Sequence, residues 1–352
     1  MRNKIAVVLI LGLTAAAGIS SYIAQGTLAR TLKAGPFVVT ASAEAIPLNS
    51  ESPSQNTVGA LTYVAGWALS SDNDDFGGWS AMVLGDGAKS FTAVSDQGVW
   101  LTANIDKDAP SLLSHALFYP FENGDQAAGS DQKKEYDAES LVRTENGFLV
   151  GLEQNHRILA VDEVGGISRR SVYDSLIDLS GLSANGGIEA MTLLPDGRLL
   201  AFAEHGLDIN GTLPVWLAGK SGAVARRFAP PQNYSPTDAA ALPNGDILLL
   251  MRYFSPIEGV SAKVLLISAA EIASGKALVG RELAHLASPL SVDNMEALDV
   301  ILLPDGSVRL YMMSDDNFNP FQRTLLMVFD WKPEIPFAPK TSPAPEAQFV
   351  AE

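Results

Sequence analysis

The sequence predicts an all-β protein, a single β-propeller of five or six four-stranded blades. Its main indication is a recurring pattern of one polar residue, a short apolar strand, an Asp-Gly or Asn-Gly turn and a second apolar strand. Such turns between apolar runs are strong hairpin signals, because their left-handed backbone matches the twist of the strands. Repeated units that each contain several strands are typical of propellers. The turns fall at Asp86, Asn146, Asp196, Asn244 and Asp305.

In chain order, the hairpin units occupy residues 77–98, 136–157, 186–206, 235–254 and 293–317. Further apolar strands follow most of them, for example HRILAVDE, PVWLAG and AKVLLISA. The long 98–136 interval leaves room for a sixth, degenerate blade. The segment ALTYVAGWALSS precedes the first unit and is expected to supply the outer strand of the last blade. This pairing would close the ring and spare the fold an exposed sheet edge.

The two ends of the chain differ in composition from the repeats. Residues 1–25 carry Arg2 and Lys4 before a long apolar run, which indicates a cleaved secretory signal or a retained N-terminal anchor. Residues 26–58 are expected to be a linker, 59–331 the propeller, and 332–352 a disordered tail rich in Pro and Ala. We therefore expect a periplasmic or secreted protein that contacts a membrane only if residues 1–25 are retained.

The composition excludes several classes of function. Lys and Arg number 24 against 40 Asp and Glu, which gives a net charge of −16 and disfavours nucleic acid and anionic lipid as partners. The absence of Cys removes disulfides, thiolate catalysis and thiolate metal sites. Neither a G-x-S-x-G nucleophile elbow nor an H-E-x-x-H zinc motif is present. We expect a monomer that binds a small anionic or ester substrate.

Propeller geometry explains why the hairpins carry polar residues far from their turns. The start of the first strand and the end of the second strand meet at the rim opposite the turn, so these residues would converge on one central mouth. At the starts of the first strands they are Ser80, Glu139, Glu189, Asp238 and Glu296. At the ends of the second strands they are Asp96, Glu153, His156, Glu204, His205, Arg252, Asp315 and Asp316. Clustered carboxylates repel one another unless they are protonated, paired with arginine or bridged by a cation. Ca²⁺ takes six to eight oxygen ligands, and we expect it here. The expected metal ligands are Glu139, Glu189, Asp238, Glu296, Asp96 and Asp315.

The same rim carries a few bases among the acids. His156 and His205 lie at equivalent strand ends, and their ordinary pKa near neutrality suits general acid–base catalysis. Arg252 and Arg323 are expected to hold an anionic group or to neutralise the carboxylates. Ser80 opens the first unit, but no His partner for a nucleophilic role can be identified. A purely structural role for each acid, bonding turn amides, is the alternative.

Several motifs resemble the phytase-like family in their order along the chain. They are FGGWSAM at 76–82, VSDQG at 94–98, GIEAM at 187–191 and DNMEAL at 293–298. This resemblance runs from about residue 59 to 331 and implies a propeller with hydrolase activity of an esterase-like kind. The DDPA-type acidic motif of the calcium-dependent propeller phytases is absent, and SPTDAAAL at 235–242 only faintly echoes it. Phytate itself is a polyanion that an acidic mouth would repel unless several cations intervened.

Three functions remain open at this point. The first is an exported, metal-assisted hydrolase of phosphate or carboxylate esters at the acidic mouth. The second is a lactonase of the gluconolactonase-like sort, which uses one cation in a propeller channel. The third is a non-catalytic propeller that presents its mouth to a partner in the cell envelope. A propeller fold is compatible with all three.

Overall fold

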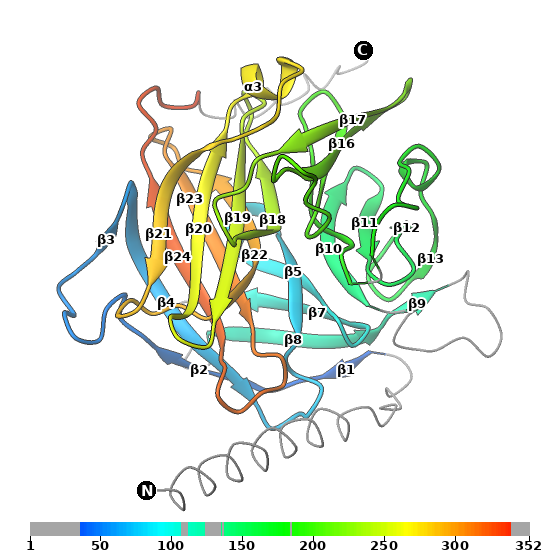
Figure 1. The fold of residues 1–352 in the computed structure, drawn as a ribbon. Coiled ribbons are helices and arrows are strands. Elements are labelled where there is room, and N and C mark those ends of the chain that lie inside the picture. Colours follow the sequence, from blue (N-terminus) through cyan, green and yellow to red (C-terminus); the bar gives the residue numbers. More distant parts are fainter. Residues whose placement is uncertain (1–35, 107–111, 124–134, 136, 184, 339–352) are drawn as a thin grey trace, which may run out of the picture. The chain divides into compact units, whose positions relative to one another are not determined.

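The computed structural model describes residues 36–106, 112–123, 135, 137–183 and 185–338, which all belong to one unit, residues 34–352. Their strands form five sheets, arranged as the blades of a β-propeller with very little helix (Figure 1). The all-β propeller prediction is therefore confirmed, with five blades.

Each blade places its first hairpin strand innermost and adds the following strands outward. Blade 1 contains β5 (Trp79–Leu84), β6 (Ser90–Ser95), β7 (Val99–Ile105), β8 (Leu113–Pro120) and β1 (Phe37–Val38). Blade 2 contains β10 (Ala138–Thr144), β11 (Gly147–Leu152), β12 (Arg157–Val161), β13 (Ile167–Arg170) and β9 (Glu122–Asn123). Blade 3 contains β14 (Ile188–Leu193), β15 (Leu199–Ala203), β16 (Leu213–Gly219) and β17 (Gly222–Phe228).

The remaining two blades complete the ring. Blade 4 contains β18 (Ser235–Ala241), β19 (Ile247–Ser255), β20 (Gly259–Ile267) and β21 (Arg281–Ala287). Blade 5 contains β22 (Asn294–Leu302), β23 (Val308–Asp315), β24 (Thr324–Trp331), β4 (Leu61–Ser71), β2 (Ala41–Ala45) and β3 (Thr57–Val58). Short helical turns lie in the connections, at η1 (Asp86–Ala88), η2 (Tyr173–Ser175) and α3 (Ala269–Ala273).

The described residues of the 98–136 interval, 98–106, 112–123 and 135, do not form a sixth blade. Its strands β7 and β8 are outer strands of blade 1, and β9 adds to the outer edge of blade 2 beside β13. The interval is long because it supplies outer strands to two neighbouring blades.

The N-terminal strand closes the ring, as the sequence predicts. The inner strands contact one another in the circular order β5, β10, β14, β18, β22 and back to β5. On the outside of blade 5, β4 pairs antiparallel with β24, from Leu69 opposite Thr324 to Leu61 opposite Trp331. The first and last parts of the repeat region thus share one sheet.

The segment before β4 holds strands where the sequence analysis expects a linker. Strand β1 pairs with β8 on the outer edge of blade 1, while β2 and β3 pair with β4 on blade 5. These pairings satisfy backbone hydrogen-bonding groups that an edge strand would otherwise leave open. The composition of residues 26–58 does not reveal such pairing. Strands β1 and β2 together form a strap across the seam between blades 5 and 1.

The predicted end segments lie mainly outside the described residues. The signal or anchor at residues 1–25 and the tail beyond residue 338 are in this category. Within the part of the chain that the structure describes, no helix has both the length and the apolar character needed to cross a membrane.

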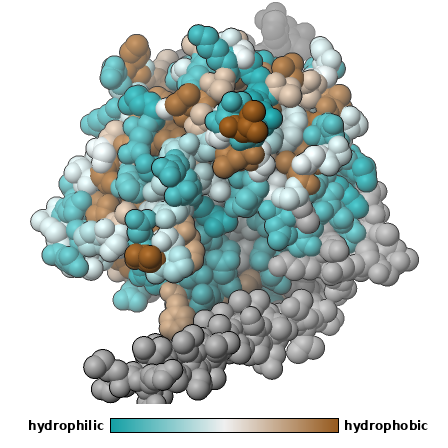
Figure 2. Space-filling view, viewed as in Figure 1, coloured by the Kyte–Doolittle hydropathy of each residue, from teal (hydrophilic) through white to brown (hydrophobic). Residues whose placement is uncertain are grey.

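The apolar core lies between the blades and holds adjacent sheets face to face. Trp100 and Phe148 pack between blades 1 and 2, and Phe202 and Phe228 between blades 3 and 4. Each fully buried large side chain contributes about 1.5–3 kcal/mol relative to an exposed one. The described residues on the face drawn in Figure 2 are mostly hydrophilic, with small, separate hydrophobic patches.

We expect Leu61→Ala in β4 to destabilise the propeller by about 2–5 kcal/mol, because Leu61 is fully buried in the core cluster next to blades 4 and 5. Urea unfolding would measure this loss. The matched control is Val64→Ala on the same strand, where the side chain is 39% exposed and the loss should stay below about 1 kcal/mol. Equal losses for the two variants would show that β4 is not part of the packed ring.

Candidate functional site

Each inner strand contains a β-bulge near its first residue, in the same place in all five blades. One residue of the inner strand is extra there, so that it has no partner on the second strand. A bulge re-aims a side chain away from the regular pleat. We call these bulge residues the first ring: Ser80, Glu139, Glu189, Thr237 and Glu296.

A second set of residues lies at the end of the second strand of each blade. Each member is opposite the residue two places before the bulge residue. The amide of Glu153 donates to Asp137 O at 2.8 Å, and the amide of Glu204 donates to Gly187 O at 3.2 Å. The register places one residue of each blade at this position. We call them the second ring: Asp96, Glu153, Glu204, Arg252 and Asp315. All five were expected at the mouth from the hairpin pattern.

Asp238 requires a correction to the predicted register. We expected it to share the position of Glu139 and Glu189, but the bulge residue of blade 4 is Thr237. Because alternate strand residues face opposite ways, a shift of one residue changes the environment completely. The Asp238 carboxylate is buried, and it accepts from Ala239 N at 2.8 Å and from Leu298 N of blade 5 at 2.7 Å. It thereby links blade 4 to blade 5, and it is not a member of the carboxylate groups described next.

Carboxylates of blades 2 and 3 gather into two groups that share one member. Oxygens of Asp137, Glu139 and Glu153 lie within 4.8 Å of one another, and so do oxygens of Glu153, Glu189 and Glu204. Glu153 belongs to both groups, so five acids form one continuous arrangement. Oxygen donors at this spacing suit a hard divalent cation such as Ca²⁺ or Mg²⁺. These buried and partly buried acids could therefore bind a metal ion.

The crowding of these acids changes their titration. Burial raises the pKa of Glu139 well above its ordinary value, and the charges of Glu189 and Asp137 raise it further. Burial likewise raises the pKa of Glu189, with added repulsion from Glu204. The pKa of Glu296 rises to about 7, chiefly through burial and against the opposing effect of Arg252. Without a cation, this end of the channel holds protons that ordinary carboxyls would release.

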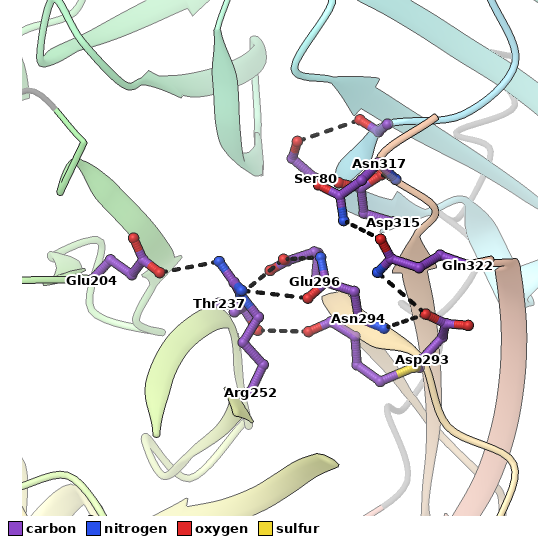
Figure 3. A network of polar contacts seen from close by, with 12 residues as sticks. Ser80, Glu204, Thr237, Arg252, Asp293, Asn294, Glu296, Asp315, Asn317 and Gln322 are labelled. Carbon is purple, nitrogen blue, oxygen red and sulfur yellow. Dashed lines mark hydrogen bonds and ion pairs between the residues drawn. The ribbon is translucent and has the colours of Figure 1, made fainter. Parts of the chain in front are cut away.

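Arg252 compensates the acids on the side of blade 4. Its guanidinium lies 2.9 Å from Glu296 and 3.1 Å from Glu204, so it links blades 3, 4 and 5 across the mouth (Figure 3). Asn294 Nδ2 also donates to Glu296 Oε1 at 2.7 Å. Glu296 is therefore held by an arginine and an amide, whereas Glu139 and Glu189 lie in the two groups that fit a cation.

Asp96 and Asp315 belong to the part of the mouth formed by blades 1 and 5. Burial and the nearby charge of Asp96 raise the pKa of Asp315 well above its ordinary value. Asp315 accepts from Asn317 N at 2.6 Å, which ties it to the β23–β24 loop (Figure 3). These two predicted ligands are close enough to interact with each other, but they are not members of the two carboxylate groups in blades 2 and 3.

The predicted bases lie at different depths. His205 is 53% exposed, and its Nδ1 is 2.7 Å from Glu204, at the edge of one carboxylate group. His156 is partly buried in the β11–β12 turn with a positive φ of 41°, and its Nδ1 has no hydrogen-bond partner among the described residues. Arg323 is half exposed and sits 3.9 Å from Asp293 on the rim of blade 5, away from the pairs that Arg252 forms.

Sequence reasoning missed three cation-binding candidates. Glu153 and Glu204 were placed at the mouth but not among the ligands, although they occupy equivalent strand ends. Asp137 was not singled out, although it lies only two residues before Glu139. The short sequence DAE at 137–139 was the available signal.

Comparison with known proteins finds a match to one protein family. The family model described as "Phytase-like: Esterase-like activity of phytase" matches residues 74–318. A search of curated proteins finds no match. Among solved structures, an endo-arabinase from Bacteroides thetaiotaomicron is similar with a TM-score of 0.49 and 11% identity, covering 80% of this chain and 100% of that one. A virginiamycin B lyase from Staphylococcus aureus has a TM-score of 0.41 and 7% identity, covering 82% and 99%. Similarities this distant carry no inference about function.

We expect chelator-treated protein to lose stability as the pH rises from mildly acidic to neutral. A carboxyl with a raised folded-state pKa binds its proton more tightly in the folded chain. Its stabilising contribution is complete below the unfolded pKa and is lost as the pH rises through the folded pKa. For Glu296 this window runs from 4.5 to about 7. Thermal unfolding across the window would measure the loss, and a flat profile would contradict it.

Glu139→Gln should raise the melting temperature of chelator-treated protein more at about pH 8 than at about pH 5. The neutral amide removes a repelling charge, and because the pKa of Glu139 is raised, less of that charge is present at the lower pH. The control is Glu145→Gln in the exposed β10–β11 turn, which should change neither value. A stabilisation by Glu139→Gln that is equal at both pH values would point to packing instead of charge.

Proposed function

The chain belongs to the phytase-like family, and from this membership and the acidic mouth we propose a hydrolase of phosphate or carboxylate esters that is assisted by a divalent cation. The observation that carries the proposal is Glu153, which is common to two groups of three carboxylates. So many acids at one end of a channel destabilise the folded chain unless positive charge reaches them. We propose Ca²⁺ as that charge, since the available donors are oxygens and several can bind at once.

When bound, the cation would polarise the ester oxygen and lower the pKa of a bound water. Asp137, Glu139, Glu153, Glu189 and Glu204 would hold it. Glu189 is buried and Glu139 is partly buried, which limits the access of bulk water and strengthens electrostatic interactions with a substrate. These roles leave the proton transfers and the substrate's negative charge to other residues.

His205 is the proposed proton carrier. Its Nδ1 faces Glu204 at 2.7 Å, and a carboxylate at that nitrogen favours the tautomer whose Nε2 can accept a proton. The half-exposed ring can exchange that proton with solvent. His156 is the second candidate for this role, since its Nδ1 makes no hydrogen bond within the described chain.

Arg252 is the proposed site for the anionic part of the substrate. Its guanidinium already bridges Glu204 and Glu296, and it lies next to the carboxylate group that contains Glu204. A phosphate or carboxylate held between Arg252 and the cation would be neutralised from two sides. Arg323 lies farther out on the rim, where it would meet an anion only as it approaches.

A non-catalytic binding propeller is the runner-up, and Arg252 is the observation in its favour. An arginine that ties two acids across the mouth can also serve only to neutralise them. A lactonase is the other catalytic candidate. Hydrolysis of a phosphate monoester, a carboxylate ester and a lactone, each with and without chelator, separates the three possibilities.

The setting of this activity is also part of the proposal. We propose that the chain acts in the periplasm or outside the cell, which the apolar run after Arg2 and Lys4 supports. The net charge of −16 argues against nucleic acid as a partner and, through repulsion between copies, favours a monomer. Cell fractionation that left the full-length chain in the cytoplasm would oppose an exported role.

Glu153→Gln should weaken Ca²⁺ binding by at least about tenfold, because it removes one charged ligand from both carboxylate groups while keeping its size. Calorimetry would measure the affinity. The rise in melting temperature that saturating Ca²⁺ gives the wild type should shrink to match. Glu145→Gln is the control and should bind Ca²⁺ as the wild type does. Absence of binding to wild-type protein, with a melting temperature that ignores chelator, would leave the binding propeller as the better proposal.

Arg252→Gln should lower kcat/KM for a phosphate monoester by about 10–100-fold, since a charge-assisted contact contributes about 1.5–3 kcal/mol. A neutral carboxylate ester should lose less, because it does not need the positive charge. Steady-state kinetics on both substrates would measure the difference. The control is Arg198→Gln, whose guanidinium pairs with Asp196 at the opposite rim. Equal losses on both substrates would assign Arg252 to holding the mouth together.

A further inference from the structure

A second concave site lies on blade 4, close to the mouth but separate from the carboxylates. It is an open pocket with a volume of about 450 Å³. Its residues come from the loop before β18, from β19 and its turn, and from the outer strands β20 and β21. The chief lining residues are Asn233, Tyr234, Tyr253, Glu258, Ser261 and His285.

The strand register fixes which side of the blade carries this pocket. Tyr253 lies opposite Ser261, and Ser261 lies opposite Ala287, so the three form one row across the sheet. Tyr253 shares its strand face with Met251, which packs in the core between blades 3 and 4. Arg252 points to the other face, toward Glu204 and Glu296. The pocket therefore opens on the blade 3 side of blade 4, beside the mouth.

Two tyrosines form the apolar part of the pocket. The rings of Tyr234 and Tyr253 have centroids 5.5 Å apart and are tilted by 38°. Lys263 Nζ lies 4.8 Å from the Tyr234 ring centroid, and it pairs with Glu282 at 2.7 Å. This cation–π contact fixes the Tyr234 ring and leaves the tyrosine pair as a platform of defined shape.

Polar groups surround this platform on several sides. The Tyr234 hydroxyl lies 2.8 Å from Ser261 Oγ and 2.9 Å from His285 Nε2. Hydroxyl, imidazole and amide groups can each donate and accept hydrogen bonds, so the pocket can match a ligand with several hydroxyls. Ser261 is buried, whereas His285 is exposed at the edge.

We propose that this pocket binds the ring of a neutral carbohydrate. A sugar ring has an apolar C–H face, which suits the flat tyrosine surfaces, and hydroxyls around its edge, which suit the polar groups. A polyanion is disfavoured by Glu258 at the pocket and by the net charge of −16. A purely apolar ligand would shield the exposed Asn233 amide and His285 ring from water without offering them hydrogen bonds, whereas a sugar can replace those to water. This binding does not depend on the proposed hydrolase activity.

The experiment is calorimetric titration of the full chain with methyl α-glucoside, methyl α-galactoside and xylose. Indole and inorganic phosphate serve as the apolar and anionic probes. We expect at least one sugar to bind with a Kd below about 10 mM. Tyr253→Ala should weaken that binding by about tenfold or more, and Tyr253→Phe, which keeps the ring, by no more than about threefold.

Phe254→Ala is the matched control. Phe254 is the next residue on β19, is 61% exposed and points to the opposite face, so removing its ring should leave sugar binding unchanged. Melting temperatures of all variants verify that they are folded. The proposal is overturned if no sugar binds, if only indole or phosphate binds, or if Tyr253→Ala binds as the wild type does. Loss of sugar binding on adding chelator would place the sugar at the acidic mouth and also overturn it.

Discussion

The candidate site depends on closure of the ring. No blade by itself assembles the mouth, because each contributes one bulge residue and one residue of the next strand. The contacts that matter cross blade boundaries, such as Arg252 of blade 4 with Glu204 of blade 3 and Glu296 of blade 5. These groups stay within reach of one another only while β4 pairs with β24 and holds the ring shut.

Closure also creates an electrostatic cost. It brings buried carboxylates together and raises the pKa of Glu139 and Glu189, so their ionised forms are disfavoured in the folded chain. A chain selected only for stability would place neutral side chains here. Natural proteins accept such local strain at sites that bind or react, where the unfavourable charge is relieved by the ligand.

The features that could be predicted from the sequence are those that neighbouring residues determine. Features that depend on pairing with another strand could not be predicted. The five hairpins, the closing strand and the second-ring residues follow from turn chemistry and alternation. The bulges do not, because Thr237 and Asp238 differ by one position and only the partner strand shows which is extra. The strand pairings of β1 and β2 could not be predicted either, since strands of two and five residues are too short to show a clear alternation. Asp137 was missed because its partner Glu153 is brought close only by the hairpin.

Because β4 and β24 lie far apart in the sequence, the ring can close only late in synthesis. Strand β4 leaves the ribosome early, but its partner β24 comes from residues 324–331, after every other blade has been made. Until then one edge of β4 is open, and exposed strand edges invite pairing with other chains. Pairing between such distant segments is intrinsically slow. A chain that stopped before Thr324 would therefore keep four blades and an unsatisfied N-terminal strand, a form prone to aggregation.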